Sequence, residues 1–190
     1  MSFTESLHQL SFGCMGVAAV LALAVSTERF IYAAANQRRA KHLLGLLTDT
    51  AQPQALHGHL GQDTVSEMVQ QLLRLREPGL DASVRQDKQD AAYLHAKDEM
   101  VSRMWILDTV VTAAPLLGLL GTIFGIVDTF LALSQSGMSD PSKVSAGIGT
   151  ALYATAMGIG IALLGLISFN YLNDRNDRLG EKLKMLILML

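Results

Sequence analysis

The sequence predicts an all-α membrane protein with three transmembrane helices. Half of the 190 residues are hydrophobic and only 17% are charged. Three apolar runs, residues 10–33, 107–133 and 144–172, each reach the ~20 residues that a helix needs to cross ~30 Å of hydrocarbon. Residues 34–106, between the first two runs, are too rich in charge to enter lipid. The composition and the three apolar runs alone therefore predict this fold class.

The basic residues predict the orientation of the chain. Residues 1–9 contain no Lys or Arg, and the 134–143 connection contains only Lys143. Segment 34–106 contains nine basic residues and the 173–190 tail four. Because basic residues favour the cytoplasmic side, residues 1–9 and the 134–143 hairpin are expected in the periplasm, and segments 34–106 and 173–190 in the cytoplasm. The first run is expected to remain as an uncleaved helix, because no positive charge precedes it.

Helix breakers divide the cytoplasmic segment. Helical patterns cover residues 37–50 and 65–75, separated by the Pro and Gly residues of 51–61, and Pro78-Gly79 ends the second pattern. No breaker follows from residue 81 to the membrane. The second transmembrane helix is therefore expected to begin in the cytoplasm, as one rod of about 50 residues at ~1.5 Å per residue.

The carboxyl tail is expected to continue the third transmembrane helix. Leu172, Leu179, Leu183 and Leu186 lie near one helical face, and the charged residues of 174–178 suit its water-exposed side. The second and third helices are thus both expected to extend into the cytoplasm.

Small residues follow one another at helical spacing in the second and third apolar runs. Such rows let two helix backbones approach closely. Packing within one subunit accounts for part of them, but their number also indicates a homo-oligomer. Pro115 removes a backbone donor and predicts a kink in the second helix. The predicted packing positions are Gly118, Gly121, Gly125, Gly147, Ala151, Ala154 and Gly158.

Two threonines fall at the same expected depth. Thr122 lies 11 residues before Leu133, and Thr155 lies 11 residues after Val144 on the antiparallel neighbour. Either hydroxyl alone can bond to a carbonyl of its own helix. Two hydroxyls at one depth on glycine-flanked faces indicate part of a polar ring.

The carboxylates of the apolar runs lie near their ends. Asp108 is close to the cytoplasmic boundary and Asp128 to the outer one, so reaching out to water remains an alternative to a functional role for each. No carboxylate lies at mid-membrane. A proton path through this chain would therefore need a titrating group from a partner.

Other functional classes find little support. His57 and His59 lack neighbouring Cys or carboxylate ligands, so no metal is predicted, and no cofactor fingerprint or catalytic motif is present. An enzyme is not expected. The net charge of −2 and the interspersed signs argue against nucleic-acid binding. The single Cys14 excludes an internal disulfide and is expected to be a small buried hydrophobe.

Three motifs resemble one known family. They are Glu28-Arg29 after the first run, Ala-Pro-Leu-Leu-Gly-Leu-Leu-Gly-Thr-Ile-Phe-Gly at 114–125, and Ala-Leu-Tyr-Ala-Thr-Ala-Met-Gly at 151–158, continuing to Asn170. With the three-span topology, they resemble the MotA/TolQ/ExbB proton-channel family and, within it, the ExbB/TolQ branch. Flagellar stator subunits of the family usually have a fourth span, which is not seen in this sequence.

The resemblance implies a pore-forming subunit of a proton-motive-force-driven motor in the bacterial inner membrane. Such subunits form pentamers whose second and third helices line a pore. Two copies of an ExbD- or TolR-like single-span protein occupy the pore and carry a membrane aspartate, and a TonB- or TolA-like energy transducer can join them. The motor energises a periplasmic or outer-membrane process. A non-conducting helical scaffold is the alternative.

The resemblance also assigns residues. Thr122 and Thr155 match the pore threonines that face the partner's aspartate. Thr150 stands where the ExbB pattern, Ile-x-Glu-Ala-Leu, usually has a glutamate, so an outer carboxylate ring is missing at that level, with Asp128 and Asp140 as alternatives that could replace it. Asp108, beside Thr112, is expected at the inner mouth of the pore.

Overall fold

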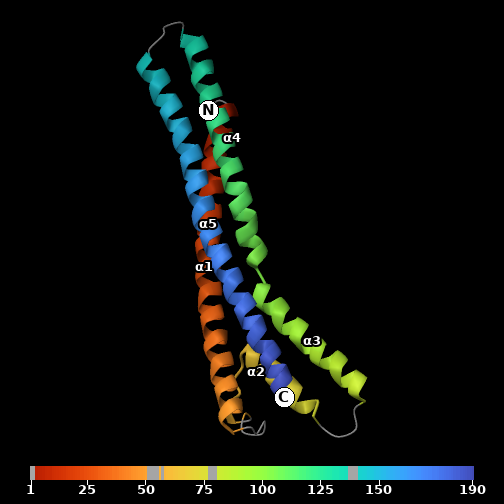
Figure 1. The fold of residues 1–190 in the computed structure, drawn as a ribbon. Helices are drawn as coiled ribbons and strands as arrows, with labels where there is room; N and C mark the ends of the chain where they lie inside the picture. The colour runs from red at the N-terminus through yellow and green to blue at the C-terminus, as the bar shows by residue number, and fades with distance from the viewer. Residues whose placement is uncertain (1–2, 51–55, 57, 77–80, 137–140) are drawn as a thin grey trace. The chain divides into compact units, whose positions relative to one another are not determined.

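The protein consists almost entirely of α-helix. The structure is a computed structural model and describes residues 3–50, 56, 58–76, 81–136 and 141–190. Figure 1 shows its helices, which are α1 (Phe3–Thr50), α2 (Thr64–Arg74), α3 (Ala82–Val101), α4 (Met104–Ser136) and α5 (Pro141–Met189). No strand occurs among these described residues. Three helical stretches, within Ser6–Asp49, Ala82–Ser134 and Pro141–Met189, are long and apolar enough to cross a membrane, which confirms the predicted fold class.

The chain divides into two compact units. Unit 1 comprises Met1–Thr27 and Arg103–Phe169, and unit 2 comprises Glu28–Ser102 and Asn170–Leu190. Helices α1 and α5 contribute to both units. With 48 and 49 residues they are each more than 70 Å long at ~1.5 Å per residue, more than twice the ~30 Å of a hydrocarbon layer. Part of each helix must therefore lie outside the membrane.

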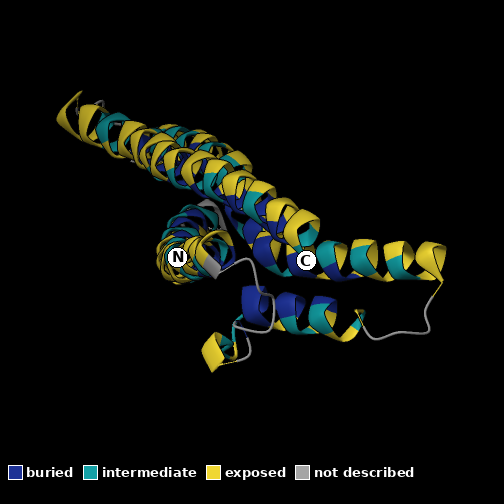
Figure 2. Ribbon diagram, turned by 60° about the horizontal axis from the view of Figure 1, so that its bottom comes forward, coloured by how far each residue is buried: buried dark blue, intermediate teal, exposed yellow. Residues whose placement is uncertain are grey.

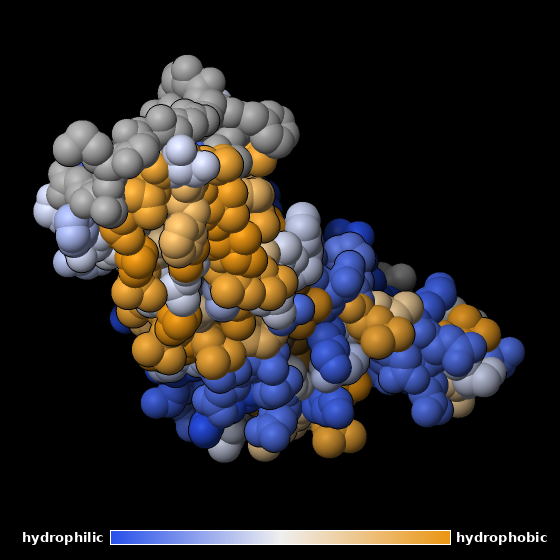
Figure 3. All heavy atoms as spheres, turned by 90° about the horizontal axis from the view of Figure 1, so that it is seen from above, coloured by the Kyte–Doolittle hydropathy of each residue, from blue (hydrophilic) through white to orange (hydrophobic). Residues whose placement is uncertain are grey.

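Unit 1 consists of α4 and the first halves of α1 and α5. Its inner faces carry mostly small residues, so the helices can approach closely. Large apolar side chains lie on the outer faces, and Figure 3 shows a broad apolar surface in its view. Outward-facing hydrophobic side chains suit contact with lipid or with other membrane helices. Examples on α4 and α5 are Leu116, Ile123, Phe130, Leu152, Leu163 and Leu164.

Unit 2 has a conventional hydrophobic core to which four helices contribute. The buried positions recur every three or four residues on each helix, which places them on one face. Figure 2 shows the buried side of α3 facing α2. The main contributors are Leu43 and Leu47 of α1, Val65, Met68, Val69 and Leu72 of α2, Ala92, Ala96 and Met100 of α3, and Leu179, Leu183 and Leu186 of α5. The predicted apolar face of the tail is thereby confirmed.

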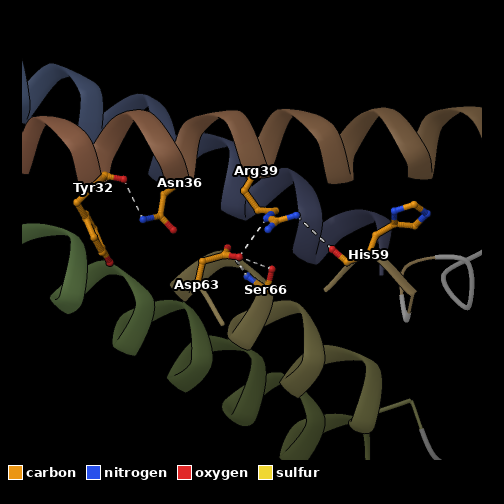
Figure 4. A network of polar contacts seen from close by, with 6 residues as sticks. All are labelled: Tyr32, Asn36, Arg39, His59, Asp63 and Ser66. Atoms are coloured by element: carbon orange, nitrogen blue, oxygen red, sulfur yellow. Dashed lines mark hydrogen bonds and ion pairs between the residues drawn. The ribbon is translucent and has the colours of Figure 1, made fainter. Parts of the chain in front are cut away.

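Asp63 connects the start of α2 to α1 (Figure 4). Its carboxylate accepts hydrogen bonds from the Ser66 backbone N–H at 3.1 Å and the Ser66 hydroxyl at 2.8 Å, which makes it the N-cap of α2. The same carboxylate pairs with Arg39 Nε of α1 at 3.1 Å. Arg39 also donates to the His59 carbonyl at 3.4 Å. Asp63 thus fixes the start of α2, and its partner Arg39 bonds to the loop before it.

The prediction of a single 50-residue rod before and through the second span is wrong. Helix α3 ends at Val101 and α4 begins at Met104, and Arg103 has φ 63°, in the left-handed region. In a continuous helix the carbonyls of Glu99 and Met100 would accept from the N–H groups of residues 103 and 104. Instead, the Glu99 carbonyl accepts from Arg29 Nη1 at 3.1 Å, and the Met100 carbonyl accepts from Asn176 Nδ2 at 3.0 Å. The Asn176 side chain of α5 therefore bonds the Met100 carbonyl, and the Arg29 side chain of α1 shares the Glu99 carbonyl with the Ser102 backbone N–H at 3.3 Å.

Several smaller expectations have mixed outcomes. The charged cluster of the tail is exposed at Asp174 and Arg178, which form an ion pair at 2.8 Å that lowers the pKa of Asp174. The prediction that Arg175 lies on the water-exposed side is wrong. Its side chain is partly buried and donates to Gln37. Cys14 is exposed on α1 rather than buried. The breakers at 51–54 and 78–79, His57 and Asp140 lie outside the described residues.

Candidate functional site

Glycines bring α4 and α5 into backbone contact in unit 1. A Cβ atom added to Gly158 would lie 2.5 Å from the Ala114 carbonyl oxygen and 3.0 Å from the Gly118 Cα. A Cβ atom added to Gly118 would lie 2.8 Å from the Ala154 carbonyl oxygen. Real Cβ atoms do not approach backbone atoms so closely, so any other residue would push the helices apart. This contact is the centre of the predicted packing row.

The row continues along both helices and also involves α1. A Cβ atom at Gly121 would meet the Ala154 Cβ at 2.9 Å and the Ser11 hydroxyl at 3.0 Å, and one at Gly125 would meet the Ala151 Cβ at 2.9 Å. Gly147 faces the Thr129 side chain. All seven predicted packing residues therefore lie in contact in the structure. Ser11 of α1 was not among them.

Thr122 and Thr155 lie together at this seam. Their hydroxyl groups are hydrogen bonded to each other. Thr122 Oγ1 also lies 3.1 Å from the carbonyl oxygens of Gly118 and Ala151, and Thr155 Oγ1 lies 3.2 Å from the Gly118 carbonyl. Both side chains are partly buried. The close approach of the glycine-rich backbones is what allows the two hydroxyls to share one carbonyl.

The pair has more hydrogen-bond acceptors than protons. Each hydroxyl carries one proton and two acceptor lone pairs, and its proton can rotate between acceptors. With two carbonyls as alternative acceptors, the pair can accept a hydrogen bond from a protonated carboxyl group or turn one proton toward a carboxylate. The pair is therefore suited to bind either protonation state of an acid placed beside it.

The other predicted pathway residues do not join the pair. Asp108 is exposed near the start of α4, and the Thr112 hydroxyl donates to the carbonyls of Asp108 and Thr109 at 3.1 and 3.0 Å. Thr150 is exposed and bonds back to the Ala146 carbonyl at 2.9 Å. Pro115 lies inside α4, which continues through it from Met104 to Ser136.

His8 is a polar residue of unit 1 that the sequence analysis missed. Its Nε2 atom is buried without a hydrogen-bond partner among the described residues, and a Cβ atom at Gly125 would lie 3.2 Å from it. Its ring packs edge-on against Phe12 with the centroids 5.0 Å apart. The spacing of His8 and Ser11, three residues apart on one helical face, was the available signal.

The match to known proteins covers both units. A model of the MotA/TolQ/ExbB proton channel family matches residues 27–185. That range includes the whole α4–α5 seam and most of unit 2. The chain belongs to the MotA/TolQ/ExbB proton channel family. Membership agrees with the resemblance that the three motifs predicted.

Relatives place the chain on the ExbB/TolQ branch of this family. It is 35% identical over 88 residues to the biopolymer transport protein ExbB of Helicobacter pylori, covering 46% of this chain and 61% of that protein. It is 38% identical over 74 residues to ExbB of Aquifex aeolicus, covering 39% and 50%. It is 36% identical over 78 residues to the Tol-Pal system protein TolQ of Haemophilus influenzae, covering 41% and 34%.

The chain thus spans less than two thirds of the length of each of these relatives. These relatives and the three helical stretches able to cross a membrane identify the chain as a multi-pass protein of the bacterial inner membrane.

Proposed function

We propose that this protein is the pore-forming subunit of a proton-motive-force-driven motor of the inner membrane. The observation that carries the proposal is the Thr122–Thr155 hydroxyl pair, which lies at the seam of two apolar helices in a member of a proton-channel family. A lipid anchor needs neither hydroxyls nor a glycine-lined backbone contact at such a place. The pair supports proton transfer because it can bind an acid in both protonation states.

The titrating acid comes from a second protein. Among the residues of the apolar runs 107–133 and 144–172, only Asp108 and Asp128 are carboxylates, and both lie near the ends. An ionised carboxylate at the centre of a membrane helix costs ~3 kcal/mol or more, so it is kept only where it has a function. The proposed partner is an ExbD- or TolR-like protein whose single span carries an aspartate.

The proposed assembly follows the family resemblance. Five copies of this chain surround the pore, with residues 1–9 in the periplasm and segment 34–106 in the cytoplasm. Proton flow past the threonine pair turns or displaces the partner. A TonB- or TolA-like transducer carries this movement to a periplasmic or outer-membrane client.

Proton flux into vesicles tests the proposal. The protein would be reconstituted alone and together with an ExbD- or TolR-like single-span protein, and the uptake of protons would be followed with a pH-sensitive dye under an imposed potential. We expect proton flux in vesicles that contain both proteins and none in vesicles that contain this protein alone. No flux in the complete complex would instead support a non-conducting scaffold.

Asp108 is the proposed exit group for protons, with Thr112 one turn further on and Thr150 toward the other end of the path. In the same vesicles, Asp108→Asn is expected to reduce flux without changing complex assembly, because the amide keeps the size of the side chain but cannot titrate. Normal flux in this variant would show that Asp108 only reaches out to water and would remove it from the path.

A further inference from the structure

A basic pocket in unit 2 is not explained by the proton path. It has a volume of about 480 Å³ and lies between α1 and α5. Phe30 and Tyr171 form its apolar wall, with their rings stacked at a centroid distance of 5.5 Å and an interplanar angle of 16°. Its other lining residues include four cations, Arg38, Lys41, Arg175 and Lys182, and no Asp or Glu.

The cations of this pocket have no carboxylate partner among the described residues. No ion pair within 4.0 Å is found for any of the four among the residues that the structure describes. By contrast, Arg39 pairs with Asp63 and Arg178 with Asp174. Four like charges around one cavity repel one another unless an anion enters, so the pocket has the electrostatics of an anion site.

Arg175 is held in position for such an anion. Its Nε and Nη2 atoms donate to the Tyr171 hydroxyl at 2.9 and 2.6 Å, and its Nη1 atom donates to Gln37 Oε1 at 2.6 Å. Gln37 in turn donates to the Arg175 carbonyl at 3.1 Å. A guanidinium group has five N–H donors, so these three bonds leave two for a bound oxygen.

The pocket lies where the apolar runs end. Phe30 belongs to the run of residues 10–33 and Tyr171 to the run of 144–172, whereas the cations Arg38, Lys41, Arg175 and Lys182 all follow these runs. Lys and Arg side chains reach several ångströms along a helix, so they can extend back to the headgroup layer. With the apolar runs in the membrane, the aromatic wall would lie nearer the acyl chains and the cations nearer the lipid phosphates.

We propose that this pocket binds the phosphate headgroup of an anionic phospholipid of the surrounding membrane. Basic pockets between membrane helices near the cytoplasmic surface recognise such headgroups. A soluble phosphate would use the cations but not the stacked aromatic wall. The proposal depends on the chain crossing the membrane and not on proton conduction.

Native mass spectrometry of the full-length protein in detergent tests the proposal. Phosphatidylglycerol would be titrated against the wild type, with zwitterionic phosphatidylethanolamine as the reference lipid. The pocket variant is Arg38→Gln/Lys41→Gln, because both side chains are exposed and their loss spares the Arg175 network. The matched control is Arg74→Gln/Arg76→Gln, which removes the same charge from exposed positions outside the pocket.

The wild type and the control should bind phosphatidylglycerol more tightly than phosphatidylethanolamine. The pocket variant should bind phosphatidylglycerol roughly 25-fold more weakly, since each basic residue near a membrane surface contributes about fivefold. Equal affinity in the wild type and the pocket variant would overturn the proposal. Competition by glycerol 3-phosphate at the same concentration would assign the pocket to soluble phosphates instead. Loss of a co-purifying protein partner with unchanged lipid binding would assign it to a protein.

Discussion

At the scale of the residue, the absence of a side chain at Gly158 is what lets α4 and α5 approach so closely. The nearest atoms to its missing Cβ are backbone atoms of α4, at 2.5–3.2 Å, and backbone cannot move aside as a flexible side chain can. The threonine pair depends on this approach, because Thr122 of one helix bonds to the Ala151 carbonyl of the other. Packing and the candidate proton site therefore rest on the same glycines.

Gly158→Ala is expected to destabilise the protein by about 1–3 kcal/mol, the usual cost of overpacking. Unfolding in mixed detergent and SDS micelles, followed by the fluorescence of Trp105, would measure the change. Gly45→Ala is the matched control, because nothing lies within 4 Å of a Cβ atom there, and alanine favours helix. Equal loss of stability in both variants would contradict the close contact at Gly158.

The sequence predicted these residues because helical spacing alone was sufficient. Counting 11 residues inward from each end of the hairpin placed Thr122 and Thr155 together, and small residues at three- and four-residue intervals marked the seam. His8 and Ser11 were missed, because their partners lie on α4, more than 100 residues away in the sequence. Their three-residue spacing marks a shared polar face of α1, but it does not say which distant helix that face meets.

At the scale of the element, the end of α3 depends on two side chains from other helices. Arg29 and Asn176 donate to the carbonyls of Glu99 and Met100. The Glu99 carboxylate also accepts from Thr64 at 2.6 Å, and Thr64 is hydrogen bonded to Tyr32. Helices α1, α2, α3 and α5 are thus connected by polar groups around the residues where α3 stops.

Asn176→Ala is expected to loosen the end of α3. The Met100 carbonyl would lose its donor in a buried place, which costs about 1–3 kcal/mol. Hydrogen exchange of the amides between residues 99 and 106 should become about tenfold faster or more, as measured by mass spectrometry. Asn173→Ala, at an exposed position of the same helix, should leave exchange there unchanged. Unchanged exchange in both variants would show that Asn176 does not hold the end of α3.

The break between α3 and α4 could not be predicted from local sequence. Residues 81–106 contain no Pro or Gly, and the residue in the left-handed region is an arginine, which takes that conformation rarely. Where the helix ends, side-chain donors from α1 and α5 bond to its last carbonyls, Glu99 and Met100, and these donors are distant in the sequence. By contrast, the starts of α2 and α3 follow Asp63 and Asp81, the residue type that local propensity favours at these positions.

At the scale of the whole molecule, the division into two units reflects two kinds of packing. Unit 1 has small residues inside and large apolar residues outside, as expected where the surroundings are lipid or other membrane helices. Unit 2 has large apolar residues inside and charges outside, as expected in water. The predicted membrane runs do not coincide with the units, because residues 28–33 and 170–172, which the sequence places in apolar runs, belong to unit 2.

The most direct test of the central claim is proton flux in vesicles containing the complex with the proposed single-span partner, measured for Thr122→Val and Thr155→Val. Valine keeps the shape of threonine but lacks the hydroxyl, so flux is expected to be lost while assembly and insertion remain normal, and serine should partly restore it. Thr129→Val is the control, because that hydroxyl bonds back to the Gly125 carbonyl of its own helix at 2.7 Å. Wild-type flux in both Thr122→Val and Thr155→Val would contradict the assignment of the threonine pair to the proton path.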